Sequence, residues 1–168
     1  MINSIFRFSL IFILLMLLQV LIFNNIQFSG YINPYIYILF ILLLPVEIPS
    51  WLLLILSFAT GLLMDFFVGS PGMHTFSTVL AGFVRPFVLR AVSPRDGYEP
   101  NSAPSMLTYG FTWFLAYSFV IVLVHHTALF YLEVFRFTEF FRTMLRVLLS
   151  TVFSVTFILL IEFYRRGK

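Results

Sequence analysis

Six long apolar segments, separated by short polar or Gly- and Pro-containing stretches, constrain the fold of this chain more than any other feature. They cover about residues 5–23, 32–46, 50–68, 73–92, 106–131 and 144–164. A transmembrane helix needs roughly 20 mostly apolar residues, and all but the short second segment approach or exceed that length. The sequence therefore predicts an all-α integral membrane protein, a bundle of about six transmembrane helices, with the shortness of the second segment leaving five spans open.

The overall composition agrees with a chain whose solvent is lipid. Hydrophobic residues make up 61% of the sequence and charged residues 10%, against about 45–50% and about 25% in soluble domains. No stretch of soluble composition is long enough for a second domain, so we expect residues 1–168 to form a single polytopic membrane domain. The first apolar segment is too long for the core of a signal peptide and predicts a retained span. Since the sequence contains no cysteine, it offers no disulfide and no thiolate ligand.

Basic residues near the ends of the segments predict the orientation, because Lys and Arg are retained on the cytoplasmic side. A cytoplasmic N-terminus places six basic residues inside: Arg7, Arg90, Arg95, Arg165, Arg166 and Lys168. Only Arg136 and Arg142, each close to a glutamate, then lie outside. We expect both termini to be cytoplasmic. The amphipathic segment 132–143 is either an interfacial helix or an early start of the last span, and the sequence leaves both open.

Two ionisable residues fall at membrane depth, where each costs about 2.5–3.5 kcal/mol on insertion scales. Asp65 ends the third segment and Arg85 lies within the fourth, and the tight turn 69–72 makes these segments antiparallel neighbours. Counted from the turn, the two side chains differ in depth by roughly 13 Å at 1.5 Å per residue. A direct ion pair therefore requires a helix that is broken near Gly82 or Pro86.

Other partners for these two side chains follow from the same register. Asp65 can cap the backbone amides after the turn or meet His74 or Thr75, while Arg85 snorkels towards the cytoplasm. The alternative is a buried polar centre that organises the bundle. Gly61 lies one helical turn before Asp65, so a neighbouring backbone can approach closely enough there to bond the carboxylate.

The remaining polar residues give no catalytic or metal-binding pattern. His125 and His126 are adjacent, so their side chains point about 100° apart in a helix and cannot share a metal ion; an interfacial position near the outer end of the fifth span is the simpler interpretation. We expect no metal, no cofactor and no enzymatic activity. Small residues four apart predict helix contact faces at three pairs: Ser77 with Ala81, Thr78 with Gly82, and Ser150 with Ser154.

Several short motifs resemble those of MreD, the rod shape-determining membrane protein family of bacteria. They are Gln19 in the first segment, Asn33-Pro34 before the second, G-L-x-x-D at Gly61, Leu62 and Asp65, Gly72-Met73-His74 after the turn, and Arg85-Pro86 in the fourth segment. The resemblance is specific over about residues 19–86. Beyond Arg90 it is one of hydropathy, and the segment 132–142 has no counterpart in the family pattern.

The resemblance implies a non-enzymatic scaffold subunit of the bacterial cell-elongation complex, the elongasome, in the cytoplasmic (inner) membrane. Its expected partner is MreC, with indirect links to MreB, RodA and a class B penicillin-binding protein, so that it regulates cell shape by organising peptidoglycan synthesis. It also implies a fold similar to the substrate-binding subunits of energy-coupling-factor transporters, and the alternative function is therefore a substrate-binding subunit of a vitamin or other small-molecule transporter. The residues expected to shape the bundle and its docking surface are Gln19, Pro34, Gly61, Asp65, Gly72, His74, Arg85 and Pro86.

Overall fold

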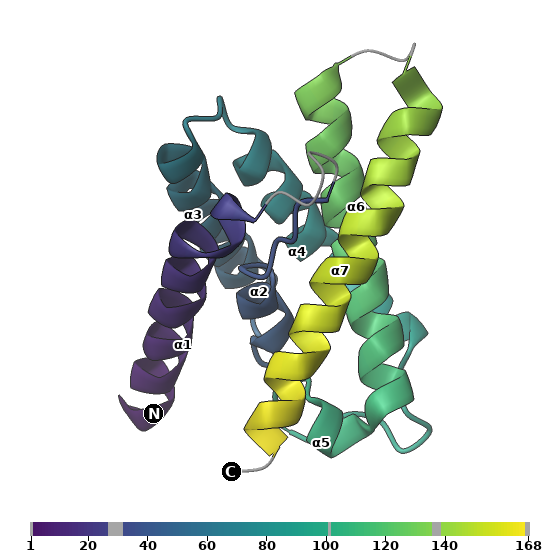
Figure 1. Ribbon diagram of the computed structural model, residues 1–168. Coiled ribbons are helices and arrows are strands. Elements are labelled where there is room, and N and C mark those ends of the chain that lie inside the picture. Colours follow the sequence, from purple (N-terminus) through teal and green to yellow (C-terminus); the bar gives the residue numbers. More distant parts are fainter. Residues whose placement is uncertain (1, 27–31, 101, 136–138, 167–168) are drawn as a thin grey trace.

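The computed structural model describes residues 2–26, 32–100, 102–135 and 139–166, and its regular elements in these ranges are helices (Figure 1). They are α1 (Ile2–Leu21), the 3₁₀ helix η1 (Phe23–Asn25), α2 (Leu39–Leu43), α3 (Ser50–Val68), α4 (Met73–Ala91), α5 (Met106–Tyr109), α6 (Phe111–Val134) and α7 (Phe140–Arg166).

Four stretches in or around these helices are long and apolar enough to cross a membrane: Phe6–Asn25, Ser50–Val68, Phe111–Val134 and Phe140–Arg165. They indicate a multi-pass membrane protein, as the composition predicts. With 19 residues α4 is also about 28 Å long, but it is less apolar because it carries Arg85, Arg90 and several hydroxyl side chains. α4 packs between α3 and α6, and this position accounts for its polar character, since its polar residues His74, Ser77, Thr78 and Arg85 are buried in the bundle.

The prediction of a spanning helix over residues 32–46 is wrong. The only helix in this range is α2, five residues long, and the residues around it are extended or in turns. Pro45 explains where α2 ends, because the residue before a proline is restricted to extended conformations, and Leu44 adopts ψ 148°. Non-helical backbone is tolerated at membrane depth only where protein covers it, and residues 36–44 are at most 5% exposed.

This buried segment runs the length of the bundle between α1 and α3. Near its start, the amides of Ile36 and Tyr37 bond to Gln19 close to the C-terminal end of α1. At its other end, the Val46 amide donates to the Ser102 carbonyl, 2.9 Å away, in the loop that leads to α5. α1 begins and α7 ends at this same end of the bundle (Figure 1). The structure thus agrees with termini on one side; which side is cytoplasmic stays a prediction.

The turn between α3 and α4 has the geometry expected of its glycines. Gly69 adopts φ 74° after the last residue of α3, and its amide donates to the Asp65 carbonyl over 2.8 Å. Gly72 adopts φ 85° immediately before α4. Both angles lie in the left-handed region that favours glycine. The helix that follows is not interrupted at Pro86, which lies inside α4.

The last two spans differ from their predicted limits at both ends. The predicted span 106–131 divides at Gly110 into α5 and α6, and α6 continues to Val134. α7 already begins at Phe140 and runs without a break to Arg166. This favours an early start of the last span over a separate interfacial helix, although residues 136–138 of the segment 132–143 lie outside the described ranges. Phe135 ends α6 with φ 43°, a left-handed conformation that costs a bulky residue about 1–2 kcal/mol.

Candidate functional site

Asp65 joins the end of α3 to the beginning of α4. Its Oδ1 accepts hydrogen bonds from the Ser70 hydroxyl (2.5 Å) and the His74 amide (3.0 Å), and its Oδ2 accepts from the amide and hydroxyl of Thr75 (2.8 and 2.5 Å). A carboxylate beside the free amides of a helix N-terminus is stabilised by both hydrogen bonds and the helix dipole. The predicted capping role of Asp65 is confirmed, and no ion pair joins it to Arg85 in the described structure.

Gly61 makes this contact between α3 and α4 possible. A Cβ atom at this position would lie 2.5 Å from the Thr75 Cα and 2.7 Å from the His74 carbonyl oxygen. Real Cβ atoms do not approach backbone so closely, so any larger residue would push α4 away from α3. The prediction that a neighbouring backbone comes close at Gly61 is confirmed, and the close approach brings the α4 amides within reach of Asp65.

Arg85 is completely buried, so the prediction that it snorkels to the cytoplasmic surface is wrong. Its Nε donates to the Tyr117 hydroxyl (2.8 Å), and its Nη2 donates to the carbonyls of Leu44 and Pro45 (3.3 Å for Pro45). The Tyr117 hydroxyl in turn donates to the Leu42 carbonyl, 3.0 Å away. These carbonyls lack helical partners because Pro45 ends α2 there, and a cation at a helix C-terminus also complements the helix dipole.

Gln19 bonds to backbone groups at the other end of the same segment. Its Oε1 accepts from the amides of Ile36 (2.7 Å) and Tyr37 (3.3 Å), and its Nε2 donates to the Pro34 carbonyl (3.2 Å) and the Asn24 side chain (2.9 Å). The Gln19 side chain is fully buried. Three residues outside a helix have backbone groups without a helical hydrogen-bond partner, and the Gln19 side chain supplies these partners.

Two serines of α7 complete the support of this segment. Ser150 Oγ accepts from the Asn33 amide (3.1 Å), and Ser154 Oγ accepts from the Tyr35 amide (2.9 Å). Both are fully buried and lie one helical turn apart on the same face of α7. The sequence predicts a helix contact face at this pair. The structure shows that both serines bond to extended backbone, and that Ser154 also contacts His126 of helix α6, 3.1 Å away.

The chain's three histidines form one buried cluster around Tyr37. The Tyr37 hydroxyl lies 2.6 Å from His125 Nε2, 3.1 Å from His74 Nδ1 and 3.2 Å from Thr78 Oγ1. His126 is next to His125, and it contacts the Val122 carbonyl (2.8 Å) and Ser154 Oγ (3.1 Å). The prediction of an interfacial position for these two histidines of α6 is wrong, since both are 0% exposed.

With neutral histidines, one assignment of the ring tautomers gives every proton of this cluster an acceptor. The Thr78 hydroxyl donates to the His74 carbonyl (2.7 Å), so its oxygen is free to accept from the Tyr37 hydroxyl. The Tyr37 oxygen then accepts from His74 Nδ1–H and His125 Nε2–H. His126 Nδ1–H donates to the Val122 carbonyl, which leaves its Nε2 to accept from Ser154. A buried polar network is stabilising only when its members are satisfied in this way.

The arrangement gives no metal-binding geometry. Over residues 2–26, 32–100, 102–135 and 139–166, no three His, Asp or Glu side chains are grouped to hold a metal ion. The His125 and His126 side chains point to different partners, as their adjacency predicts. That the protein uses no metal or cofactor stays a prediction.

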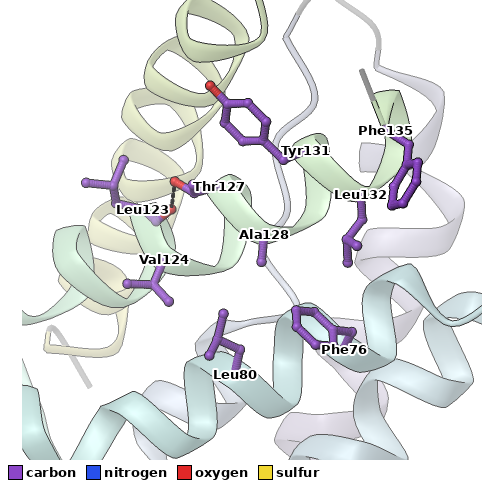
Figure 2. A pocket seen from close by; sticks show the side chains of 9 residues that line it. All are labelled: Phe76, Leu80, Leu123, Val124, Thr127, Ala128, Tyr131, Leu132 and Phe135. Atoms are coloured by element: carbon purple, nitrogen blue, oxygen red, sulfur yellow. Dashed lines mark hydrogen bonds between the residues drawn. The ribbon is translucent and has the colours of Figure 1, made fainter. Parts of the chain in front are cut away.

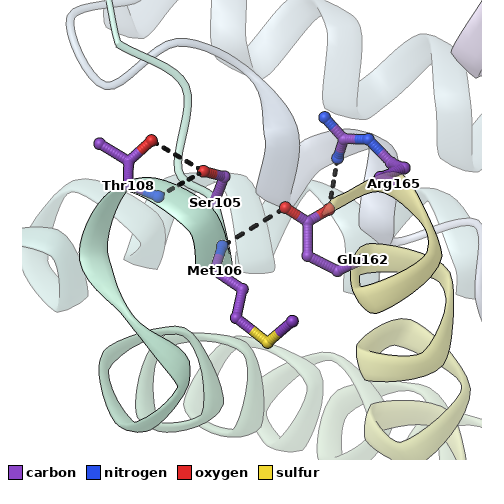
Figure 3. Close-up of polar contacts among 5 residues, drawn as sticks. All are labelled: Ser105, Met106, Thr108, Glu162 and Arg165. Carbon is purple, nitrogen blue, oxygen red and sulfur yellow. Dashed lines mark hydrogen bonds and ion pairs between the residues drawn. The ribbon is translucent and has the colours of Figure 1, made fainter. Parts of the chain in front are cut away.

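A second buried carboxylate, not identified from the sequence, lies near the C-terminal end of α7, and Figure 3 shows its contacts. Glu162 of α7 is 3% exposed; its Oε1 accepts from the Met106 amide at the start of α5 (3.3 Å), and its Oε2 accepts from Arg165 (2.5 Å). Ser105 caps the same turn by accepting from the Thr108 amide over 3.1 Å. Glu162 therefore ties α5 to α7, just as Asp65 ties α4 to α3.

Most of the predicted site residues belong to one internal structure. Gln19, Pro34, Asp65, His74 and Arg85 contact the extended segment or the α3–α4 junction, and Gly61 and Gly72 provide the backbone geometry that these contacts need. The carbonyl of Pro86 accepts from Arg90 at 3.3 Å, and Pro86 contributes no contact to the cluster in the part of the chain described. Sequence reasoning missed Tyr37, Tyr117 and Glu162, which lie in apolar surroundings without a motif.

Comparison with known proteins adds no independent assignment. The chain matches no protein-family model, no curated protein and no solved structure. A functional conclusion therefore rests on the contacts described above and on the short motifs of the sequence.

Proposed function

We propose that this protein is a non-enzymatic scaffold subunit of the bacterial cell-elongation complex, which helps to organise peptidoglycan synthesis by binding membrane partners. MreC is the partner that the MreD-like motifs imply, with MreB, RodA and a class B penicillin-binding protein linked through it. The proposal includes a cytoplasmic membrane location, six passages of the chain and cytoplasmic termini.

The observation that carries this proposal is the use that the chain makes of its buried polar groups. Gln19 and Arg85 bond to the backbone of the extended segment, and Asp65 bonds to the backbone of α4. An enzyme or a ligand-binding subunit presents such groups to a substrate, whereas here they are engaged by the protein itself. This favours a protein whose motif residues preserve the shape of a bundle that other membrane proteins recognise.

Charges at the two ends of the bundle support the proposed orientation. Arg7, Arg90 and Arg165 belong to the end at which α1 begins and α4 and α7 end. Glu162 balances Arg165 at that end, at a distance of 2.5 Å. At the opposite end, glutamates balance both Arg142 and Arg146: Arg146 is 3.0 Å from Glu133, and Arg142 is 3.6 Å from Glu139. Excess positive charge at the first end fits a cytoplasmic position for it.

The proposal is tested by depletion and complementation in the native host. We expect depleted cells to lose their normal shape and the tagged protein to co-purify with MreC. Asp65→Ala removes the α3–α4 cap and should abolish both complementation and MreC recovery. Asp96→Ala makes the same change in an exposed loop and should complement fully. Normal shape after depletion, together with no MreC in the purified sample, would reject the proposal.

A second candidate, a substrate-binding subunit of a small-molecule transporter, is favoured by one observation. The Tyr35 ring lies edge-on to His74, His125 and His126, with centroid distances of 5.2, 6.2 and 5.5 Å, in the interior of the bundle. Aromatic and imidazole rings grouped in this way can recognise a planar ligand. Native mass spectrometry decides: a retained small molecule that is lost in Tyr37→Phe supports this candidate, and an empty protein without an associated ATPase counts against it.

A further inference from the structure

An open groove of about 610 Å³ lies between α4 and α6 on the outside of the bundle. Figure 2 shows the side chains that border it, with Phe76 and Leu80 of α4 on one side and Val124, Ala128 and Leu132 of α6 on the other. The groove begins where α4 begins and α6 ends. It therefore opens into the membrane leaflet at the end of the bundle that carries the α3–α4 turn.

The groove walls accept hydrocarbon and offer little to a polar ligand. Of the residues that line the groove, Thr127 and Tyr131 carry hydroxyl groups. The Thr127 hydroxyl donates to the Leu123 carbonyl over 2.7 Å, and the Tyr131 hydroxyl is directed at the Phe140 carbonyl, 3.4 Å away. Both hydroxyls are thus directed at the protein's own backbone, and the other lining side chains are apolar. The affinity of a bound molecule for this groove would therefore come from the burial of its hydrocarbon.

The dimensions of the groove fit one acyl chain. From Leu123 to Phe135 the α6 wall is about 18 Å long at 1.5 Å per residue, close to the roughly 15 Å of hydrocarbon in one leaflet. The groove volume of about 610 Å³ lies within the range of about 300–1,000 Å³ typical of small-ligand pockets.

Phe135 is an independent indication that the groove has an occupant. It lines the mouth of the groove, is 84% exposed and adopts φ 43°, ψ 31°. This left-handed position at the end of a helix is ordinarily filled by Gly or Asn. An aromatic ring held there in an unfavourable conformation, with little cover from the described chain, is explained when the ring packs against a bound molecule.

We propose that the α4–α6 groove binds one acyl chain of a membrane phospholipid from the leaflet at the α3–α4 end, with the Phe135 ring covering the chain near the headgroup layer. This site is independent of the scaffold function proposed above. Two other apolar grooves, of about 620 and 890 Å³, lie on the surface, and Phe135 borders neither of them.

The experiment uses the full-length protein in detergent micelles supplied with dioleoyl phosphatidylglycerol, and native mass spectrometry counts bound lipid. Ala128→Phe fills the groove, and Ala116→Phe makes the same change nearer the other end of α6, in a smaller groove of about 470 Å³ between α6 and α7. We expect about one retained lipid in the wild type and in Ala116→Phe, and about tenfold lower occupancy in Ala128→Phe. Equal retention in all three proteins, or no retention in the wild type, overturns the proposal.

Two further measurements keep the result clear if Ala128→Phe folds poorly. Phe135→Gly removes both the ring and the unfavourable backbone conformation. Without added lipid, the purified variant should therefore unfold at the same temperature as the wild type or at a higher one. When the lipid is added, the unfolding temperature of the variant should rise less than that of the wild type. A photo-reactive benzoylphenylalanine at position 132 should form an adduct with the mass of the phospholipid. An adduct only with another protein would show that a partner helix fills the groove and would refute the lipid assignment.

Discussion

The replacement of Gln19 by methionine tests whether buried side chains hold the extended segment in place. Methionine has nearly the same length and volume but neither donates nor accepts as an amide does. Gln19→Met would leave three backbone groups of the extended segment without their partner: the amides of Ile36 and Tyr37 and the carbonyl of Pro34. Water cannot replace these contacts, because Gln19 is fully buried.

The expected loss follows from the number of contacts. Hydrogen bonds inside membrane proteins contribute on average about 0.6 kcal/mol and at most about 1.7 kcal/mol each. Three such contacts give a decrease in the free energy of unfolding of about 2–5 kcal/mol, a large fraction of the 5–15 kcal/mol typical of a folded protein. The contact to Ile36, at 2.7 Å, should account for the largest share.

Unfolding in mixed micelles by sodium dodecyl sulfate, followed by circular dichroism, measures this difference. Leu18→Met is the matched control, because Leu18 is the neighbouring residue, faces outward and should change stability by less than about 0.5 kcal/mol. Hydrogen exchange gives a local readout, since the Ile36 and Tyr37 amides should lose protection in Gln19→Met before the helices do. A stability change no larger than that of the control, with unchanged exchange at both amides, would refute the reasoning.

Three other predictions follow from close contacts. Gly61→Ala should lower the free energy of unfolding by about 2 kcal/mol or more, because the new Cβ atom would meet the backbone of Thr75. In Gly82→Ala the new Cβ atom instead meets the Ser57 hydroxyl. The additional change Ser57→Ala should therefore restore most of the stability of Gly82→Ala in the same unfolding assay. Tyr117→Phe leaves Arg85 with fewer acceptors and the Leu42 carbonyl without its donor. This change should lower the free energy of unfolding by about 1–3 kcal/mol, and a decrease below about 0.5 kcal/mol would contradict the role assigned to the Tyr117 hydroxyl. Glu162→Gln should free the start of α5 and speed proteolysis of the 92–105 loop, whereas an unchanged cleavage rate would show that Glu162 does not hold α5.

The candidate site could be predicted from the sequence where its contacts are local. Asp65 and the α4 amides are separated by a four-residue turn, so helix geometry alone brings them to similar depth. The same is true of the glycines, whose use follows from the turn and from the spacing between Gly61 and Asp65. The contacts of Arg85 could not be predicted, because they join residues about 40 and 32 positions apart and depend on a segment whose helix ends early.

The histidine cluster shows a second limit of sequence reasoning. His125 and His126 lie between Val124 and Thr127 in a mostly apolar segment without a spaced partner, so the sequence pattern alone places them at an interface. Their actual partners, Tyr37 for His125 and Ser154 for His126, come from two distant parts of the chain. The pattern of one helix indicates which of its faces is polar, but it carries no information on what that face meets.

The sequence by itself determined that this is a multi-pass helical membrane protein and where its apolar segments lie, and it placed Asp65 within reach of the amides that follow the α3–α4 turn. Hydrophobic length and hydrogen bonds across a short turn are local properties. Only the tertiary structure decided that residues 32–46 run through the bundle largely without a helix. Backbone at membrane depth must find partners for its amides and carbonyls, and whether Gln19, Arg85, Ser150 and Ser154 can supply them depends on how distant helices pack together.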